Sequence, residues 1–283
     1  MSKGLLDPKV DFVFKNIFGS PNHPEILISF LNATLKAKKK IVNVDIKKTD
    51  IEKQYIEDKY SRLDVKATTS NDEIINIEIQ LKNENNMVKR SLYYLSKMYE
   101  EQLNEKEDYS KLVRTVCINI LNFKYLKTDN FHTGYRFKEI ESNEELTDIM
   151  EVHFIEIPKL QDSSDEKDML VAWTEFLKDP ESEKVRGLEL SIEEIRQAKD
   201  ELIRMSNDST QRELYDMRAN SLRDKMSELN AAERKGIEKG REEGREEGRK
   251  EGIEEGRKEE KIEIARNMKL SGLDTNTIAK ITN

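Results

Sequence analysis

The sequence predicts an α/β domain, a central mixed β-sheet flanked by helices, followed by a charged helical C-terminal tail. Three observations predict this fold class. Segments with the apolar spacing of helices alternate with segments that have the period-two spacing of strands. Two adjacent strand-like segments have the pattern of an antiparallel hairpin. Glycine recurs at every fourth position from Gly236 to Gly256, within a segment rich in arginine, lysine and glutamate.

The composition limits which classes of protein the chain can belong to. Hydrophobic residues make up 36% and charged residues 37% of the 283 residues, so the core occupies only part of the chain. The apolar runs are too short to span a bilayer, and the start lacks the apolar region of a signal peptide. The single cysteine, Cys117, excludes an intramolecular disulfide, and the three histidines lack the spacing of a zinc site. We therefore expect a cytoplasmic protein without a membrane partner.

The chain before the hairpin is expected to contain two helices and a strand. In Val10–Phe18 the apolar residues fall at positions 10, 13, 14, 17 and 18, with Pro8 before the helix and Gly19 directly after it. Pro24–Leu35 has the same helical spacing. Ile41–Lys48 alternates apolar and polar residues and is expected to be a strand.

The hairpin is predicted from two alternating segments. Apolar residues occupy positions 63, 65 and 67 in the first segment, and 75, 77, 79 and 81 in the second. Ser70–Glu73 between them contains residues that favour turns. If the turn is centred on Asn71, residues whose numbers add up to 142 face each other. This register places Asp64 opposite Glu78, Arg62 opposite Gln80 and Lys66 opposite Asn76, all on the polar face.

Two carboxylates that face each other across a strand pair repel each other, and a divalent cation between them would reverse this effect. Mg²⁺ is commonly held by one or two carboxylates together with phosphate oxygens and water, and it promotes the attack of water on a phosphodiester. Asp11 is a further candidate for binding the metal or positioning water. The pattern also fits an ordinary solvent-facing hairpin, with Asp11 an exposed acid at a helix N-terminus.

The elements after the hairpin are expected in the order helix, three strands, helix. Val113–Phe123 is rich in β-branched residues, which indicates a buried strand. The other elements are helix Asn85–Leu103, weaker strands Phe131–Ile140 and Val152–Ile157, helix Asp168–Leu177, and a charged helical stretch from Ser191 to about Glu233.

The glycine repeat has two interpretations. Each glycine inside a helix costs about 1 kcal/mol relative to alanine, and favourable charge pairs are expected only at i,i+3, as for Glu242 and Arg245. The repeat is either a solvated helical spacer or a close-packing stripe for self-association, although a period of four drifts around a 3.6-residue helix. The closing segments, Ile262–Leu270 and Leu273–Thr282, are also compatible with a helix-turn-helix that reads DNA.

Several short stretches occur in a characteristic order: Leu6–Lys15, Ile28–Asn32, Leu63–Ala67, Asn76–Gln80, Lys89–Tyr94 and Ile155–Lys159, followed by the Gly-Arg-Glu-Glu repeat and the closing segment. In this order they resemble the PD-(D/E)XK nuclease superfamily and, more narrowly, the PD-(D/E)XK nuclease family transposases, also called the recombination-promoting nuclease family. The resemblance covers nearly the whole chain. It implies a PD-(D/E)XK restriction-endonuclease-like core.

The resemblance also implies a site and an activity. Asp64 and Glu78 would bind Mg²⁺, with Mn²⁺ as an alternative, and the backbone carbonyl of Ile79 would be a further ligand. The superfamily's lysine, two positions after the acid, is Gln80 here. The resemblance leaves the positive charge to Lys82 or Arg62.

Lys89 and Arg90 open the helix after the hairpin and are candidates for contacts with DNA phosphates. We expect residues 1–180 to form the nuclease-like domain, 181–234 a helical segment, 235–261 the repeat tail and 262–283 a short helix-turn-helix-like end. The expected function is metal-dependent DNA endonuclease activity, serving recombination or transposition. A catalytically silent DNA-binding or regulatory protein is the alternative, favoured by Gln80 and the net charge of −8. A third interpretation is a scaffold that forms homo-oligomers through the tail.

Overall fold

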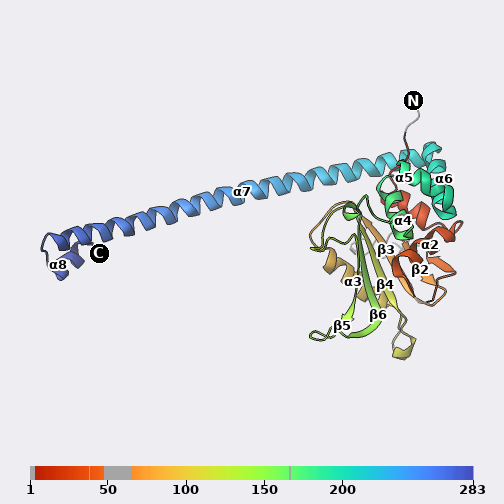
Figure 1. The fold of residues 1–283 in the computed structure, drawn as a ribbon, viewed down its shortest axis with the longest axis horizontal. Coiled ribbons are helices and arrows are strands. Elements are labelled where there is room, and N and C mark those ends of the chain that lie inside the picture. The colour runs from red at the N-terminus through yellow and green to blue at the C-terminus, as the bar shows by residue number, and fades with distance from the viewer. Residues whose placement is uncertain (1–3, 38, 48–64, 166, 283) are drawn as a thin grey trace. The chain divides into compact units, whose positions relative to one another are not determined.

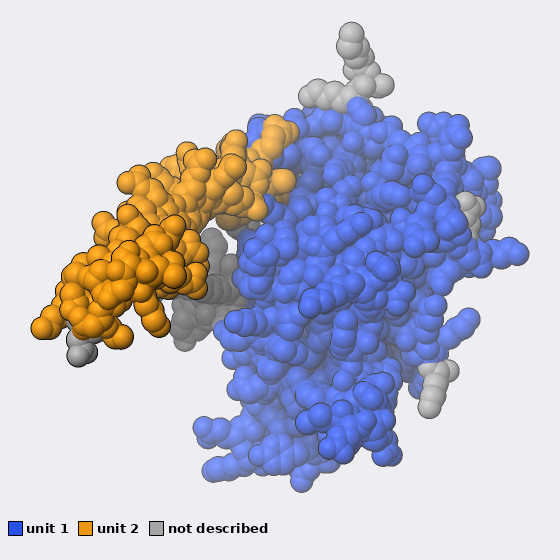
Figure 2. All heavy atoms as spheres, turned by 60° about the vertical axis from the view of Figure 1, so that its left-hand side comes forward, with its two compact units in different colours: residues 1–221 blue, residues 222–283 orange. Residues whose placement is uncertain are grey.

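The computed structural model describes residues 4–37, 39–47, 65–165 and 167–282 (Figure 1). Contacts divide the chain into two compact units, residues 1–221 and residues 222–283, which are coloured blue and orange in Figure 2. None of the described helices combines the length and the apolar character needed to cross a membrane.

A mixed six-stranded sheet lies at the centre of the first unit (Figure 1). Its strand order is β1-β2-β3-β4-β6-β5. β3, β4 and β6 are parallel to one another, and the other neighbouring pairs are antiparallel. The strands are β1 (Val44–Lys47), β2 (Val65–Thr69), β3 (Ile74–Gln80), β4 (Thr115–Leu121), β5 (His132–Lys138) and β6 (Glu145–Glu156).

The hairpin between β2 and β3 has the register that the sequence predicts. Val65 pairs with Ile77 and Lys66 pairs with Asn76, so the paired residue numbers add up to 142. Asp64 and Arg62 lie outside the described residues. Position 78 on β3 is described, and it pairs on its other side with Asn119 of the parallel strand β4.

Helices cover both faces of the sheet, which confirms the predicted fold class. On one face, α1, α2 and α4 share an aromatic cluster. Phe14 stacks on Phe18 with ring centroids 4.6 Å apart, and Phe18 packs edge-on against Phe30 and Trp173. The indole nitrogen of Trp173 also donates a hydrogen bond to Ser29 Oγ, 3.2 Å away. These helices are α1 (Asp11–Phe18), α2 (Pro24–Leu35) and α4 (Met169–Lys178).

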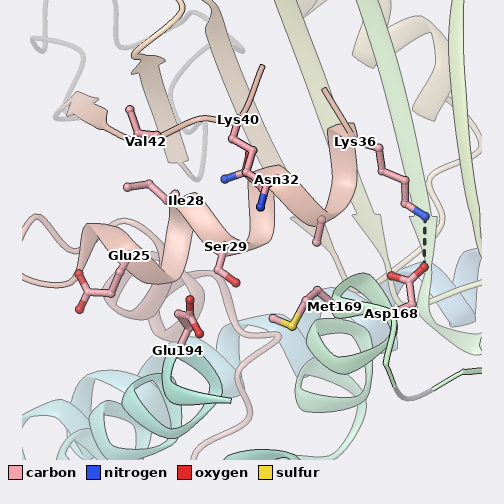
Figure 3. Close-up of a pocket in the computed structure, with 11 residues that line it drawn as sticks. Glu25, Ile28, Ser29, Asn32, Lys36, Lys40, Val42, Asp168, Met169 and Glu194 are labelled. Atoms are coloured by element: carbon pink, nitrogen blue, oxygen red, sulfur yellow. Dashed lines mark hydrogen bonds and ion pairs between the residues drawn. The ribbon is translucent and has the colours of Figure 1, made fainter. Parts of the chain in front are cut away.

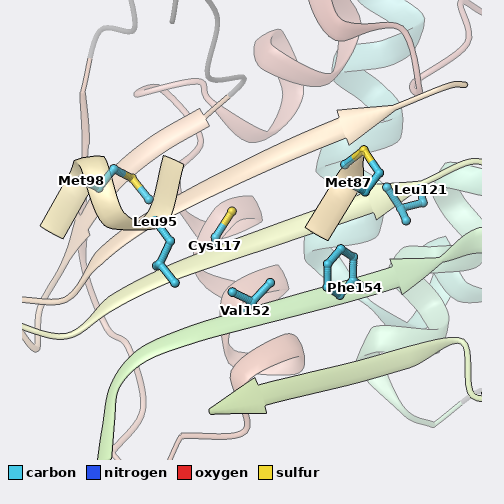
Figure 4. Packing of buried hydrophobic residues seen from close by; sticks show 7 residues of the cluster. All are labelled: Met87, Leu95, Met98, Cys117, Leu121, Val152 and Phe154. Carbon is cyan, nitrogen blue, oxygen red and sulfur yellow. The ribbon is translucent and has the colours of Figure 1, made fainter. Parts of the chain in front are cut away.

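The opposite face of the sheet is covered by α3 (Met87–Glu100). Met87, Leu95 and Met98 of this helix pack onto side chains of β4 and β6 (Figure 4). Burying a large apolar side chain contributes about 1.5–3 kcal/mol, so this cluster fixes α3 against the sheet. The strand residues of the cluster are Cys117, Leu121, Val152 and Phe154.

One strand and the stretch after residue 180 differ from the sequence prediction. β6 begins at Glu145 rather than Val152, because its polar first half pairs with the exposed strand β5 through an irregular register. The stretch after residue 180 contributes α5 (Glu183–Ser191) and α6 (Glu193–Asn207) to the same compact unit as the sheet. The buried positions of α6 that account for this packing are Ile195, Ala198, Leu202 and Met205.

The second unit contains most of α7 (Ser209–Leu270) and α8 (Thr275–Thr282). Every residue from 232 to 264 is exposed. Gly272, at φ +86, ends α7 in a Schellman motif, in which Leu273 donates to the carbonyl of Met268 and Gly272 to that of Lys269.

Ion pairs along α7 correct one expectation. Favourable pairs also form at i,i+4, between Lys239 and Glu243, Lys250 and Glu246, and Lys258 and Glu254. These i,i+4 pairs use the lysines of the segment, whereas the expected i,i+3 pairs use its arginines.

Candidate active site

Glu78 is a buried carboxylate in the middle of the sheet. It lies on the face of β3 that also carries Asn76, and its side chain is only 1% exposed. The alternating pattern allowed this face to be in solvent, but α3 covers it. A buried carboxylate needs hydrogen-bond donors or a cation, because burial disfavours its charged form.

Two side chains supply donors to Glu78. Arg90 Nε of α3 lies 3.2 Å from Glu78 Oε2, and Asn76 Nδ2 lies 3.4 Å from Oε1. Burial raises the pKa of Glu78 above its ordinary value, although the charge and hydrogen bond of Arg90 and the hydrogen bond of Asn76 act in the opposite direction. Because the Asn76 contact is long, Oε1 of Glu78 has only a weak hydrogen bond within the described part of the chain.

The helix that carries Arg90 is held in place by polar contacts as well as by its apolar cluster. Ser91 Oγ lies 2.9 Å from Asn119 Oδ1 on β4 and donates to the carbonyl of Met87. The Arg90 guanidinium lies over the ring of Tyr94, 5.2 Å from its centroid. The position of Arg90 relative to Glu78 is thus set by the packing of the whole helix.

The other predicted residues lie around this pair in different environments. Ile79 points into the apolar core on the other face, so only its backbone carbonyl is suited to metal binding. Gln80 is half-buried at the end of β3, Lys82 is half-buried just after it, and Lys89 is exposed on α3.

Asp11 belongs to a separate contact. Its carboxylate pairs with Arg218 of α7 at 2.9 Å and accepts a hydrogen bond from the backbone nitrogen of Phe12. No hydrogen bond or ion pair joins it to Glu78 among the described residues. Asp11 lies in the first turn of α1, where the helix dipole favours an acidic side chain.

The donors present fit a hard divalent cation. Glu78 and the carbonyl of Ile79 offer only oxygen ligands, which Mg²⁺ prefers. Asn76 Oδ1 is buried without a hydrogen-bond partner in the described structure, which adds an unsatisfied oxygen on the residue that contacts Glu78. No three His, Cys, Asp or Glu side chains among the described residues gather as a metal cluster. The second carboxylate expected here, Asp64, lies outside those residues.

Comparison with known proteins identifies the family. The family model for PD-(D/E)XK nuclease family transposases matches residues 8–232. The chain belongs to this family. No curated protein and no solved structure matches it.

Membership of the PD-(D/E)XK nuclease family transposases confirms the resemblance seen in the sequence. It indicates a nuclease with a transposition-related function and DNA as the substrate. Nucleases of the PD-(D/E)XK type generally use divalent metal ions. The match covers the hairpin, Glu78 and α3, so the site described above lies within the family region.

A buried ion pair that sequence reasoning missed lies at the end of β6. Glu156 is fully buried, and its Oε2 accepts a hydrogen bond from Lys159 Nζ at 2.7 Å. Lys159 also donates to the backbone carbonyls of Leu126 and Thr128, and Glu156 Oε1 accepts from the backbone nitrogen of Leu126. The pair therefore fixes the loop after β4. The signal was present in the Ile155–Lys159 stretch, whose acid and base are three residues apart.

A second missed cluster joins two histidines that the sequence separates. Glu151 accepts hydrogen bonds from His153 and Arg136, at 2.6 and 2.8 Å, and also from Arg114. Burial alone would raise the pKa of Glu151, but these hydrogen bonds outweigh it and hold the pKa at about 2. His153 in turn contacts His132. The paired strands β5 and β6 bring the two histidines, Arg136 and Glu151 together, and Arg114 reaches Glu151 from the position before β4.

A hollow of the first unit lies away from Glu78 and Gln80. It has a volume of about 680 Å³, lies along α2 and is lined by Ser29, Asn32 and Lys40 among others (Figure 3). Lys36 and Asp168 form an ion pair of 3.1 Å at its edge, and both are substantially exposed. An exposed pair of this kind contributes little energy to stability.

Proposed function

We propose that this protein is a Mg²⁺-dependent DNA endonuclease of the cytoplasm, with Mn²⁺ as an alternative ion, that acts in recombination or transposition. The observation that carries the proposal is the Glu78 site: a buried carboxylate on β3, held beneath α3 by an arginine, within the family region. A buried, ionisable group with specific charged partners is characteristic of functional sites.

Each residue of the proposed site has a distinct task. Glu78 and Asp64 would hold the ion, with the Ile79 carbonyl as a further ligand. When bound, the ion would stabilise negative charge on the phosphate oxygens. The amide of Gln80 would orient the attacking water through hydrogen bonds. Lys82 would supply positive charge near the phosphate.

Three further residues have proposed roles farther from the reacting phosphate. Lys89, exposed on α3, would contact the DNA backbone. Arg62, which the register expected from the sequence places opposite Gln80, would add positive charge. Asp11 would be an accessory group that becomes available only if it leaves Arg218.

A catalytically silent DNA-binding or regulatory protein is the second candidate. The observation that favours it is the ion pair itself, because Arg90 occupies one oxygen of the carboxylate that would hold the metal. Because Gln80 occupies the position of the superfamily's lysine, β3 also lacks the positive charge of that lysine. Such a protein would bind DNA equally well with and without a divalent ion.

Cleavage of supercoiled plasmid tests the proposal. The full chain is assayed with Mg²⁺, with Mn²⁺ and with EDTA, beside Asp64→Asn and Glu78→Gln. We expect cleavage with metal, none with EDTA, and a loss of orders of magnitude in both variants. Glu175→Gln is the matched control, since Glu175 is also buried and paired with a cation, Lys184. Metal-independent DNA retardation in a gel without any cleavage would instead establish the silent protein.

A further inference from the structure

The proposed site lacks a cation on its own strand. The position two residues after Glu78 is Gln80, whose amide is neutral. A phosphodiester carries negative charge that increases on the oxygens as the bond breaks, and a fixed positive group nearby stabilises it. The described structure supplies such a group from the next helix rather than from β3.

Arg90 reaches Glu78 with only one of its three guanidinium nitrogens. Nε makes the bond to Glu78, while Nη1 and Nη2 donate to no residue that the structure describes. The arginine side chain is 29% exposed, whereas Glu78 is 1% exposed. Arg90 therefore extends from the buried carboxylate toward solvent and retains four N–H donors. A planar pair of such donors matches two oxygens of a phosphate.

The guanidinium is fixed before any ligand arrives. It lies over Tyr94, which is buried, and its helix is bound to β4 through Ser91 and Asn119. An ordinary surface arginine differs in each respect. Arg204, for example, is 62% exposed and pairs with Glu201 of its own helix. Preorganised charge is more effective at a reacting group than a mobile side chain.

We propose that Arg90 binds the scissile phosphate and so takes the place of the missing lysine. Nε stays on Glu78, and the terminal nitrogens hold the phosphate beside the carboxylate. This inference rests on the proposed nuclease function, but it also predicts DNA binding without metal. A purely structural role, as the counter-ion of Glu78, predicts no such contact.

The binding test removes metal and catalysis altogether. Fluorescence anisotropy of a labelled duplex is measured in EDTA with Glu78→Gln and with Glu78→Gln/Arg90→Gln. Both variants lack the Glu78 charge, so neither leaves an unpaired buried carboxylate that would prevent folding. We expect the double variant to bind about tenfold more weakly. We also expect its salt slope to fall by about one. Arg204→Gln in the Glu78→Gln background should bind as that background does.

The activity test asks whether a lysine on the strand can replace the arginine. Plasmid cleavage with Mg²⁺ is measured for Arg90→Gln and for Arg90→Gln/Gln80→Lys. We expect the single variant to lose about a hundredfold in kcat/KM, with KM raised because the ground-state phosphate contact is also lost. The added lysine should restore part of that loss by supplying positive charge, but not all of it, because the water contact proposed for the Gln80 amide is given up. A structural defect would allow no recovery.

The outcomes separate this inference from the proposed function. Unchanged affinity and salt slope in the double variant would overturn the role of Arg90, whatever the enzyme cleaves. If the wild-type protein does not cleave DNA with either Mg²⁺ or Mn²⁺, the proposed nuclease function is overturned. The anisotropy measurement in EDTA would still decide whether Arg90 contacts the phosphate. Loss of cleavage in Arg90→Gln without recovery by Gln80→Lys, together with unchanged binding, would leave Arg90 as a counter-ion only.

Discussion

His132 Nε2 lies 2.9 Å from His153 Nδ1, and the two imidazole rings stack with an interplanar angle of 13°. Burial is the main cause that lowers the pKa of His132 to about 4, and the neighbouring His153 and Lys36 act in the same direction. Asp168 and Glu151 act against them. His132 is therefore neutral at pH 7.

The stability of the protein should fall between pH 6.5 and pH 4 because of His132. The unfolded chain binds this proton near pH 6.5, whereas the folded chain resists it until about pH 4. The stabilisation linked to neutral His132 is complete above pH 6.5. It is lost as the pH falls to 4, which lowers the free energy of unfolding by about 3 kcal/mol. Urea unfolding across this range should show a shallower pH dependence for His132→Asn than for wild type. An NMR pKa of His132 near 6.5 would refute the prediction.

Lys159→Met should destabilise the first unit by about 3 kcal/mol or more, because it leaves Glu156 buried without its cation. Denaturant unfolding measures this loss. Hydrogen exchange should also speed up at Tyr125 and Leu126, whose amides bond to Glu156. Lys178→Met, which breaks the exposed pair with Asp162, should cost less than about 1 kcal/mol. Equal losses of stability in the two variants would show that the buried pair of Glu156 and Lys159 contributes no more than the exposed pair.

Alanine should be tolerated at Gly244 and not at Gly19. A Cβ added at Gly244 has no atom within 4 Å, so Gly244→Ala should stabilise the helix by about 1 kcal/mol. At Gly19 the added atom would lie 2.7 Å from the carbonyl oxygen of Lys15, and the substitution should destabilise the first unit. Circular dichroism melts of both variants measure these effects. Stabilisation at both positions would contradict the explanation.

Removal of residues 235–283 should leave the melting temperature of the first unit nearly unchanged. The repeat has no apolar stripe to bury, and its charged residues are exposed. Light scattering on the same truncated chain tests the interpretation of the tail as an oligomerisation segment. A change from a larger species to a monomer would establish self-association, and a large drop in melting temperature would show that the tail stabilises the core.

Periodicity predicted the strand register but not the surroundings of Glu78. Alternation in the hairpin places Asn76 and Glu78 on one face, and the pairing of Lys66 with Asn76 confirms this register. Alternation says nothing about what covers a polar face. In a parallel sheet both faces are buried, and here the covering element comes from the following helix.

The helical spacing of α3 could have predicted that Arg90 lies on the side of the helix that faces the sheet. Its position next to Lys89 in the sequence instead suggested the same role for both residues. The buried positions of α3 are Met87, Ser91, Tyr94, Leu95 and Met98, and Arg90 lies three residues after Met87 and four before Tyr94. Positions three and four apart share a helix face. Lys89 is displaced by about 100° and stays exposed, so the two neighbours that the sequence paired as DNA contacts have different environments.

The packing of α3 on the sheet also determines how the protein responds to thiol reagents. Cys117, the one cysteine of the chain, is fully buried beneath this helix, and burial raises its pKa to about 12. The thiolate is the reactive form, so the folded protein should be inert to maleimides. Cysteines introduced at exposed positions would then be labelled selectively without removal of the native one. Slow labelling of Cys117 itself would measure how often α3 opens from the sheet.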